Sequence, residues 1–234
     1  MEKLNILTII PVRSGSKRLK NKNIKMLNNK PLMAYSIQAG LGSRYTHDVI
    51  VSTDSTEYAK IAKDYGALTP FIRPKEISLD STSTYEVLEH AINFYKEQNK
   101  IFTYILLLQA TSPLRESKHI DSAIELALYK NADCVISVCE CDHPKEWSNV
   151  LGEDLSLDNF IDKKIQGKRS QDLPKNYRLN GAIYFAKIEN LLLNEGFYMP
   201  NSFAYIMPRE VSIDIDSEFD FLMAETLLLN KGKL

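Results

Sequence analysis

The chain has 234 residues, of which 44% are hydrophobic and 25% are charged. It is therefore large and apolar enough to bury one substantial core, and a disordered protein is excluded. Its 29 Lys and Arg residues nearly balance its 30 Asp and Glu residues, which excludes the overall positive field of a general nucleic-acid-binding protein. Any preference for an anionic partner must arise from a local cluster of charge.

The chain shows no sign of a membrane segment or of a disulfide framework. No uncharged apolar run approaches the roughly 18 to 20 residues that span a bilayer, and the first residues lead directly into a predicted strand. We therefore expect a soluble, cytoplasmic protein with no membrane partner. The cysteines Cys134, Cys139 and Cys141 are odd in number and close together, which argues against disulfides. A zinc site of Cys139, Cys141 and His143 is disfavoured because it lacks a second pair of ligands.

Apolar runs typical of strands alternate with segments of helical spacing over roughly the first 140 residues. In chain order, the predicted strands are 4–12, 49–53, 68–72, 104–109 and 134–138. The predicted helices between them are 31–44, 55–65, 84–98 and 118–130. In the third helix, apolar residues at i, i+3, i+4 and i+7 fall on one face, namely Leu88, Ala91, Ile92 and Tyr95. This alternation predicts an open, mainly parallel α/β sheet.

The alternation breaks down after Cys139. The stretch 142–175 combines His143-Pro144, the single tryptophan Trp147 and a basic run at 163–169, with little periodicity. A long irregular segment of this kind predicts an inserted arm at an active-site rim or a subunit interface. The α/β pattern then resumes, with strands predicted over 181–186, 204–207 and 211–215 and a final helix over 218–229.

A basic loop, residues 13–25, follows the first predicted strand. It carries six Lys or Arg residues and no Asp or Glu, and ligands of open α/β sheets bind where such loops leave the strands. The loop lacks the glycine spacing of a P-loop or a dinucleotide-binding turn, so side-chain cations would have to bind phosphate. Arg13 can bind it as a fork and Lys22 as a point charge, while Ser14 and Ser16 add hydroxyl donors. The alternative is a solvated surface loop.

An acidic segment, residues 212–216, reads Ser-Ile-Asp-Ile-Asp. On a strand, Asp214 and Asp216 would share one face about 7 Å apart while Ile213 and Ile215 enter the core. Two such carboxylates suit Mg²⁺, which takes its remaining ligands from water and phosphate oxygens. The alternative is an edge strand with solvated acids, in which Asp216 caps the last helix.

Three further positions have both a functional and a structural interpretation. After the strand that ends at Gln109, the polar residues at 111–115 could bind a hydroxyl-rich or phosphorylated ligand, or could form a turn with a capping serine. In the run at 178–184, Arg178 could bind a carboxylate and Tyr184 could form an aromatic wall, while Asn180-Gly181 is also typical of an ordinary hairpin. Asp54 is more typical of a helix N-cap than of a ligand. The histidines have no partners that would support a hydrolytic triad.

Taken together, these segments resemble the bacterial CMP-sialic acid synthetases, or N-acylneuraminate cytidylyltransferases, over essentially the whole chain. The resemblance implies a single three-layer α/β nucleotidyltransferase domain over 1–234, with a mainly parallel, mixed Rossmann-like sheet and a small inserted dimerisation lobe. The motifs that carry the resemblance, in chain order, are IIPVRSGSKRLKNKN at 9–23, VSTDS at 51–55, Arg73-Pro74 followed by Asp80, LLQATSPLR at 107–115, RLNGAIYF at 178–185 and SIDID at 212–216.

The resemblance also implies roles for individual residues. Those similar to the family's nucleotide-binding residues are Arg13, Ser16, Lys22, Asn23, Arg73 and Thr84. Those similar to its sugar-binding residues are Gln109, Arg178, Asn180, Tyr184, Phe197 and Tyr198. Asp214 and Asp216 resemble the ligands of Mg²⁺ or Mn²⁺, and with Lys22 and Arg13 they would form the catalytic set. The middle lobe would mediate a homodimer and send Lys163, Lys164, Lys168 or Arg169 into the partner's site.

The implied reaction transfers CMP from CTP to the anomeric hydroxyl of a nine-carbon 2-keto acid sugar and releases pyrophosphate. N-acetylneuraminic, legionaminic and pseudaminic acids stay open as the sugar, because Arg18 and Ala110 depart from the usual family pattern. One alternative is a synthetase of CMP-3-deoxy-manno-octulosonate, and another is a non-catalytic nucleotide-binding module. A phosphatase is disfavoured because the first strand lacks a D-x-D motif.

Overall fold

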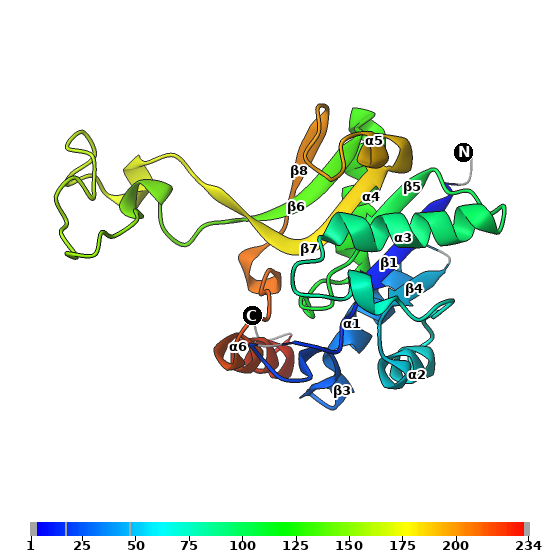
Figure 1. The fold of residues 1–234 in the computed structure, drawn as a ribbon. Helices are drawn as coiled ribbons and strands as arrows, with labels where there is room; N and C mark the ends of the chain where they lie inside the picture. Colours follow the sequence, from blue (N-terminus) through cyan, green and yellow to red (C-terminus); the bar gives the residue numbers. More distant parts are fainter. Residues whose placement is uncertain (1–3, 17, 47, 232–234) are drawn as a thin grey trace.

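The protein is described from a computed structural model that covers residues 4–16, 18–46 and 48–231. Its centre is a six-stranded sheet with the order β4-β1-β5-β7-β6-β8, and Figure 1 shows helices on both of its faces. A separate two-stranded ladder joins β2 (Met26–Leu27) to β3 (Lys30–Pro31). The strands of the large sheet are β1 (Ile6–Pro11), β4 (Val49–Ser52), β5 (Tyr104–Leu107), β6 (Cys134–Glu140), β7 (Tyr177–Lys187) and β8 (Ser202–Ile206).

The sheet is mixed, as predicted. β1 pairs in parallel with β4 and β5, and β6 pairs in parallel with β8, whereas β7 runs antiparallel to both β5 and β6. The two faces of β1 belong to different core clusters, because Ile6 and Ile10 join one cluster and Leu7 and Ile9 the other. Burial on both faces explains why this strand is a continuous apolar run.

Helices cover the sheet on two sides, which confirms the predicted three-layer α/β architecture. One core cluster joins the sheet to α1, α2 and α4, and the second joins it to α3 and α5. The predicted face of α3 is buried from Leu88 to Tyr95. The helices are α1 (Leu32–Leu41), α2 (Thr56–Asp64), α3 (Thr84–Glu97), α4 (Ser117–Lys130), α5 (Ile188–Leu193) and α6 (Glu218–Leu229). The short α5 was not predicted.

Two predicted strands do not form. The predicted strand 68–72 is reduced to a single bridge between Ile50 and Leu68, because Pro70 has no N–H to donate to a longer ladder. The predicted strand 211–215 is also wrong, since this stretch follows a short 3-10 helix, Arg209–Val211, and pairs with no strand among the described residues. The N–H of Ile215 instead donates to the carbonyl of Thr111 at 2.9 Å.

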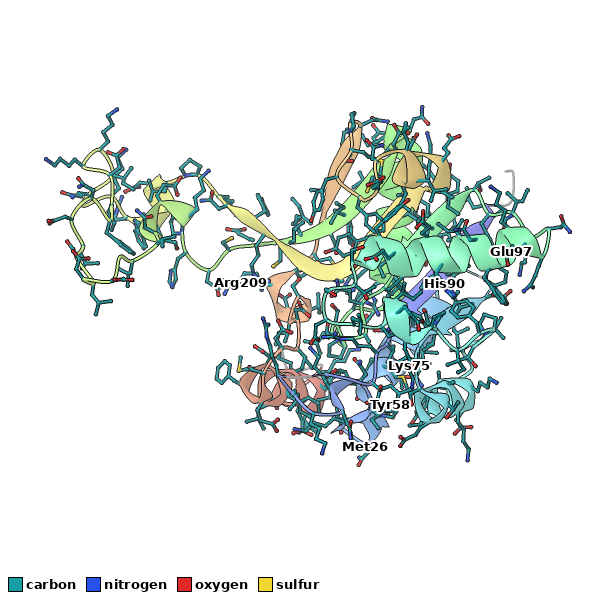
Figure 2. The ribbon with its side chains drawn as sticks, viewed as in Figure 1. Met26, Tyr58, Lys75, His90, Glu97 and Arg209 are labelled. Atoms are coloured by element: carbon teal, nitrogen blue, oxygen red, sulfur yellow. The ribbon has the colours of Figure 1, made fainter. Side chains whose placement is uncertain are left out.

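Residues 141–176 form an arm between β6 and β7 that projects away from the sheet (Figure 1). Apart from the 3-10 helices Lys145–Trp147 and Ser170–Asp172, the arm is irregular, and Pro144 is its one buried residue. Arg209 lies near the base of the arm in Figure 2 and pairs with Asp142. The arm coincides with the stretch where the sequence loses its periodicity, and its role at a subunit interface stays a prediction. Among the described residues, no helix has the length and apolar character needed to cross a membrane.

Candidate functional site

A cavity of about 660 Å³ opens beyond the carboxyl ends of β1 and β5. Its walls come from the basic loop, from residues 73–84, from the loop after β5 and from Asp216. The fold thus brings together segments that lie far apart in the sequence, at the edge where parallel α/β sheets bind ligands. The predicted site residues that line this cavity are Arg13, Ser16, Lys22, Asn23, Arg73, Thr84, Gln109 and Asp216.

Two cations of the basic loop meet Asp216 on one wall of the cavity. The Nζ of Lys22 lies 3.1 Å from Oδ1 of Asp216 and donates to the carbonyl of Ile215 at 2.5 Å. Arg18 reaches Oδ2 of the same carboxylate at 2.9 Å. The side chain of Lys22 is only 13% exposed, so its charge is directed into the site rather than dispersed in solvent.

Hydrogen bonds to the body of the protein and within the loop itself hold the basic loop in place. The backbone N–H and the hydroxyl of Ser14 both donate to the Asp54 carboxylate at 2.9 Å. The side-chain amide of Asn23 donates to the carbonyl of Arg13 at 3.1 Å. The expectation that Asp54 caps the next helix is wrong, because Ser55 is the N-cap of α2. Asp54 instead anchors the loop.

The wall formed by residues 73–84 contributes a buried cation and a second acid. Arg73 is 3% exposed and donates from Nε to the hydroxyl of Ser78 at 3.0 Å, and burial lowers the pKa of its guanidinium. Arg13 forms an ion pair of 2.5 Å with Asp80. Thr84 opens α3 behind a capping box made by Ser83, so its position at the cavity is set by the start of a regular helix.

Asp214 lies next to the cavity without lining it. Burial raises the pKa of Asp214, a hydrogen bond from Thr111 lowers it, and the nearby Asp216 carboxylate raises it. Within the described chain, Oδ1 of Asp214 is buried without a hydrogen-bond partner. A buried, unpaired carboxylate oxygen beside a second carboxylate fits a hard divalent cation, which often takes only one or two protein carboxylates.

In the acidic segment, the two isoleucines face the core as predicted, although the segment forms no strand. Ile215 is fully buried and Ile213 is partly buried, and both pack on the core cluster of Leu27 and Phe221. The alternative in which Asp216 caps the last helix is wrong, because Ser217 is the N-cap of α6. The described ranges contain no group of three or more His, Cys, Asp or Glu side chains that could hold a metal ion.

The predicted turn at Asn180-Gly181 is not a hairpin turn, because both residues lie inside the long strand β7. Gly181 has a positive φ of 71°, and a Cβ atom at this position would lie 3.2 Å from Oε1 of Gln109 and 3.4 Å from Oδ2 of Asp214. Only glycine lets these two side chains approach the strand so closely without strain. The register between β6 and β7 shifts between Ile136 and Val138, which gives β7 the irregularity of a β-bulge.

The structure places Asn180 in the core, which differs from the expected contact with substrate. Asn180 is 1% exposed. It accepts a hydrogen bond from the Ser137 hydroxyl at 2.6 Å and donates from Nδ2 to the Ser212 hydroxyl at 2.9 Å. Its side chain therefore ties β7 to β6 and to the acidic segment instead of facing the cavity.

Four predicted sugar-binding residues do not line the cavity, namely Arg178, Tyr184, Phe197 and Tyr198. The ring centroids of Tyr184 and Phe197 are 5.1 Å apart, and Tyr198 is 70% exposed beside them. Burial, together with the nearby Tyr198 and Asp214, raises the pKa of Tyr184 to about 12. Asp214 is thus near the aromatic group and also near Gly181, beside the cavity-lining Gln109. Arg178 is exposed on β7, opposite Cys139.

Two residues organise the site in a way that the sequence interpretation did not predict: Thr111 was considered only as a ligand contact, and Asp80 was given no role of its own. The carbonyl of Thr111 holds the acidic segment by accepting the N–H of Ile215, and Asp80 binds Arg13. Their positions gave partial signals, because Thr111 follows a predicted strand and Asp80 precedes a Ser/Thr run. Neither signal identifies the partner, which lies more than 60 residues away along the chain in each case.

A family model described as Cytidylyltransferase matches residues 7–230. The chain belongs to the cytidylyltransferase family. The N-acylneuraminate cytidylyltransferase of Escherichia coli O18:K1:H7 is 40% identical over 97% of this chain and 53% of its own length, so the chain spans about half of that relative. The pseudaminic acid cytidylyltransferase of Campylobacter jejuni is 35% identical over 94% of this chain and 95% of its own length. The resemblance drawn from the sequence motifs is thereby confirmed.

A solved structure extends the likeness to the fold of this cytidylyltransferase. A CMP:2-keto-3-deoxy-manno-octonic acid synthetase complexed with CTP matches it with a TM-score of 0.69 at 15% identity, covering 97% of this chain and 99% of the other. At this identity the likeness concerns the fold, and it agrees with the nucleotidyltransferase architecture expected from the sequence.

Proposed function

We propose that this cytidylyltransferase transfers CMP from CTP to the anomeric hydroxyl of a nine-carbon 2-keto acid sugar of the sialic acid type, with release of pyrophosphate. The observation that carries the proposal is the meeting of Lys22 and Arg18 with Asp216 at one cavity, with Asp214 directly behind. Cations for a triphosphate and carboxylates for a divalent metal are thereby combined. The named relatives, which act on N-acylneuraminate and pseudaminic acid, support this sugar class.

Different walls of the cavity would bind different parts of the two substrates. Arg13, Ser16, Lys22 and Asn23 would bind the triphosphate, because they share the wall formed by the basic loop. Arg73 and Thr84 would contact the cytidine at the wall formed by residues 73–84. The sugar would lie beyond Gln109, toward the aromatic group and Arg178, so that its hydroxyl faces the α-phosphate near Asp214 and Asp216.

The chemistry requires no protein nucleophile. The sugar hydroxyl attacks the α-phosphorus in line, a phosphorus–oxygen bond forms, and the bond to the departing pyrophosphate breaks. Lys22 would stabilise the charge that develops on the phosphate oxygens, since its ammonium is held at the cavity wall by Ile215 and Asp216. Alignment and charge neutralisation explain why a catalytic triad is not needed.

Asp214 and Asp216 would hold the metal ion, Mg²⁺ or Mn²⁺. The unpaired buried Oδ1 of Asp214 and the adjacent Asp216 carboxylate fit such an ion. When bound, the ion neutralises negative charge on the phosphates and polarises the phosphate under attack. Asp216, which Lys22 and Arg18 contact, would then also be a ligand of the ion.

A homodimer in the cytoplasm completes the proposal. The arm exposes apolar side chains, among them Val150 at 90% and Leu155 at 69%, which is typical of a surface that a partner covers. Its basic residues would then approach the partner's cavity, and these are Lys163, Lys164, Lys168 and Arg169.

The proposal is tested by pyrophosphate release from CTP with each candidate sugar. The sugars are N-acetylneuraminic, legionaminic and pseudaminic acids and 3-deoxy-manno-octulosonate, and CTP is then replaced by other nucleoside triphosphates. We expect turnover with CTP and a nine-carbon acid. Turnover only with 3-deoxy-manno-octulosonate would support the eight-carbon alternative. Calorimetric CTP binding without pyrophosphate release from any sugar would support a non-catalytic nucleotide-binding module.

A further inference from the structure

Arg115 is a buried cation that has no acidic partner within the described part of the chain. The residue is 2% exposed. Its Nη1 donates to the carbonyl oxygens of Ala182 at 2.9 Å and Gln109 at 3.3 Å. Its Nε and Nη2 are buried without a hydrogen-bond partner. Burial of an unpaired guanidinium is costly, and an apolar side chain of similar volume avoids that cost. The role of the guanidinium must therefore be to hold the two carbonyl groups to which it donates.

These two carbonyls lie just past the end of the β5–β7 ladder. The last antiparallel pair of that ladder is Leu107 and Tyr184. Gln109 lies two residues after Leu107, and Ala182 lies two residues before Tyr184. Arg115 donates to the carbonyls of both residues at the point where the β5–β7 ladder has ended. Side-chain hydrogen bonds therefore link the two segments where backbone hydrogen bonds no longer do. The Ser36 hydroxyl of α1 donates to the same Gln109 carbonyl at 2.9 Å.

The bridged pair lies directly beside the cavity. Gln109 lines the cavity, and Ala182 follows Gly181, where Oε1 of Gln109 and Oδ2 of Asp214 both lie within about 3.5 Å of the place a Cβ would occupy. The spacing between β5 and β7 at this point therefore sets how Gln109 and Asp214 face each other. A small separation of the two strands would move both groups.

The same loop also determines where the acidic segment lies. Two residues beyond Gln109, the carbonyl of Thr111 accepts the N–H of Ile215 at 2.9 Å, and the Thr111 hydroxyl donates to Oε1 of Gln109 at 3.4 Å. Asp214 and Asp216 flank Ile215, so a shift of the loop would be passed to both carboxylates. Arg115 itself donates to carbonyls and not to either carboxylate. It also does not line the cavity.

We infer that Arg115 is a positioning residue: its guanidinium fixes the spacing of Gln109 and Ala182, and through Thr111 it sets the placement of Asp214 and Asp216. The inference deepens the proposed function and rests on it for the kinetic consequence. Arg115 touches no substrate, so its loss should impair the alignment of the reacting groups more than the binding of CTP.

The kinetic test compares Arg115→Met and Arg115→Lys with a matched control, Ile124→Val, which trims a fully buried side chain of α4 far from the cavity lining. We expect Arg115→Met to lower kcat about 100-fold, as misplacement of reacting groups by an ångström can do, while the KM for CTP changes less than about threefold. Arg115→Lys should recover part of the loss because one ammonium can still donate to a carbonyl. Ile124→Val should keep the wild-type kcat. A wild-type kcat in Arg115→Met would overturn the inference.

Amide hydrogen exchange provides a readout that does not depend on turnover. Residues 109–112 and 212–216 should exchange faster in Arg115→Met than in Ile124→Val, with rates compared at equal global stability. If Arg115→Met does not fold, Arg115→Lys is compared in the same way. Equal exchange in the variant and the control would contradict the inference. If the wild type releases no pyrophosphate with any sugar, the proposed function fails, and the exchange comparison still decides the role of Arg115.

Discussion

The chain has two basic segments of similar composition in very different surroundings. In the basic loop, Lys22 and Arg18 bind Asp216, and Arg13 binds Asp80, an acid from a distant part of the chain. In the arm, Arg169 pairs with Asp172, three residues away. The basic loop is therefore already part of a formed site, whereas the basic run of the arm can join a site only if another surface covers it.

This difference shows that clustered charge does not by itself define a binding site. The loop is anchored by Asp54 and braced internally by Asn23, and its cation Lys22, which is 13% exposed, acts over a short distance with little screening. The side chains of the arm project into solvent, as Figure 2 shows, and exposed charges contribute little until they are desolvated.

The strongest test of the formed site is Asp216→Asn. We expect kcat to fall about 1,000-fold, because the change removes a charge at the proposed metal site and leaves Lys22 and Arg18 without their anion. The fold should survive, since this side chain is 51% exposed. Steady-state kinetics and circular dichroism check both expectations. The matched control is Glu218→Gln, two residues later, which affects only the Lys25 pair; normal turnover of Asp216→Asn at saturating Mg²⁺ would remove this residue as a metal ligand.

A direct comparison of the two basic segments uses Lys22→Ala and Lys168→Ala. Loss of Lys22 should lower kcat about 100-fold, because it removes a cation that is held at the cavity wall. Lys168→Ala should have a much smaller effect, and that effect should appear only where the protein self-associates. Single-turnover kinetics at several protein concentrations separate the two. Equal losses of kcat at every concentration would show that the arm belongs to the site of its own chain.

Substitutions on the apolar surface of the arm test what covers it. Val150→Ser together with Leu157→Ser should weaken self-association about tenfold, since the two side chains are 90% and 67% exposed and bury apolar area only against a partner. Sedimentation equilibrium measures this change. Thermal unfolding of the monomer should shift little, because exposed substitutions usually change stability by about 0.5 kcal/mol or less. Unchanged self-association would place the subunit interface elsewhere.

The smallest expected effect concerns an ion cluster in the body. Hydrogen bonds from Lys231 and Lys118 lower the pKa of Glu116 from 4.5 to about 2. Because the folded-state pKa is the lower one, the stabilisation is present above pH 4.5 and is lost as the pH falls toward 2. Both lysines are largely exposed, so screening limits the contribution to less than about 1 kcal/mol.

Urea unfolding of wild type and Glu116→Gln checks this expectation. The variant should be less stable at pH 6, and the difference should shrink at pH 3. Glu153→Gln, in the exposed arm, serves as the control and should follow the wild type at both pH values. A difference for Glu116→Gln that is constant with pH would contradict the assigned cause.

Several features of the molecule could be predicted because they depend on local pattern. The buried face of α3 follows from helical spacing, and β1 is recognisable from its continuous apolar run. The arm is recognisable because its periodicity is lost. The strand predicted at 211–215 failed for a different reason: the segment has the right alternation, but Ile215 donates its hydrogen bond to a loop and not to a neighbouring strand.

The sequence by itself determined the alternation of the main strands and helices, the position of the basic loop after the first strand, and the family, because periodicity and motifs are properties of neighbouring residues. Only the tertiary structure decided which distant residues bond to one another. It placed Asp54 under the basic loop, buried Asn180 between Ser137 and Ser212, and brought Arg115 to the end of the β5–β7 ladder. Hydrogen bonds and ion pairs depend on distances of about 3 Å, and such distances between remote residues exist only once the sheet has formed and the core has packed.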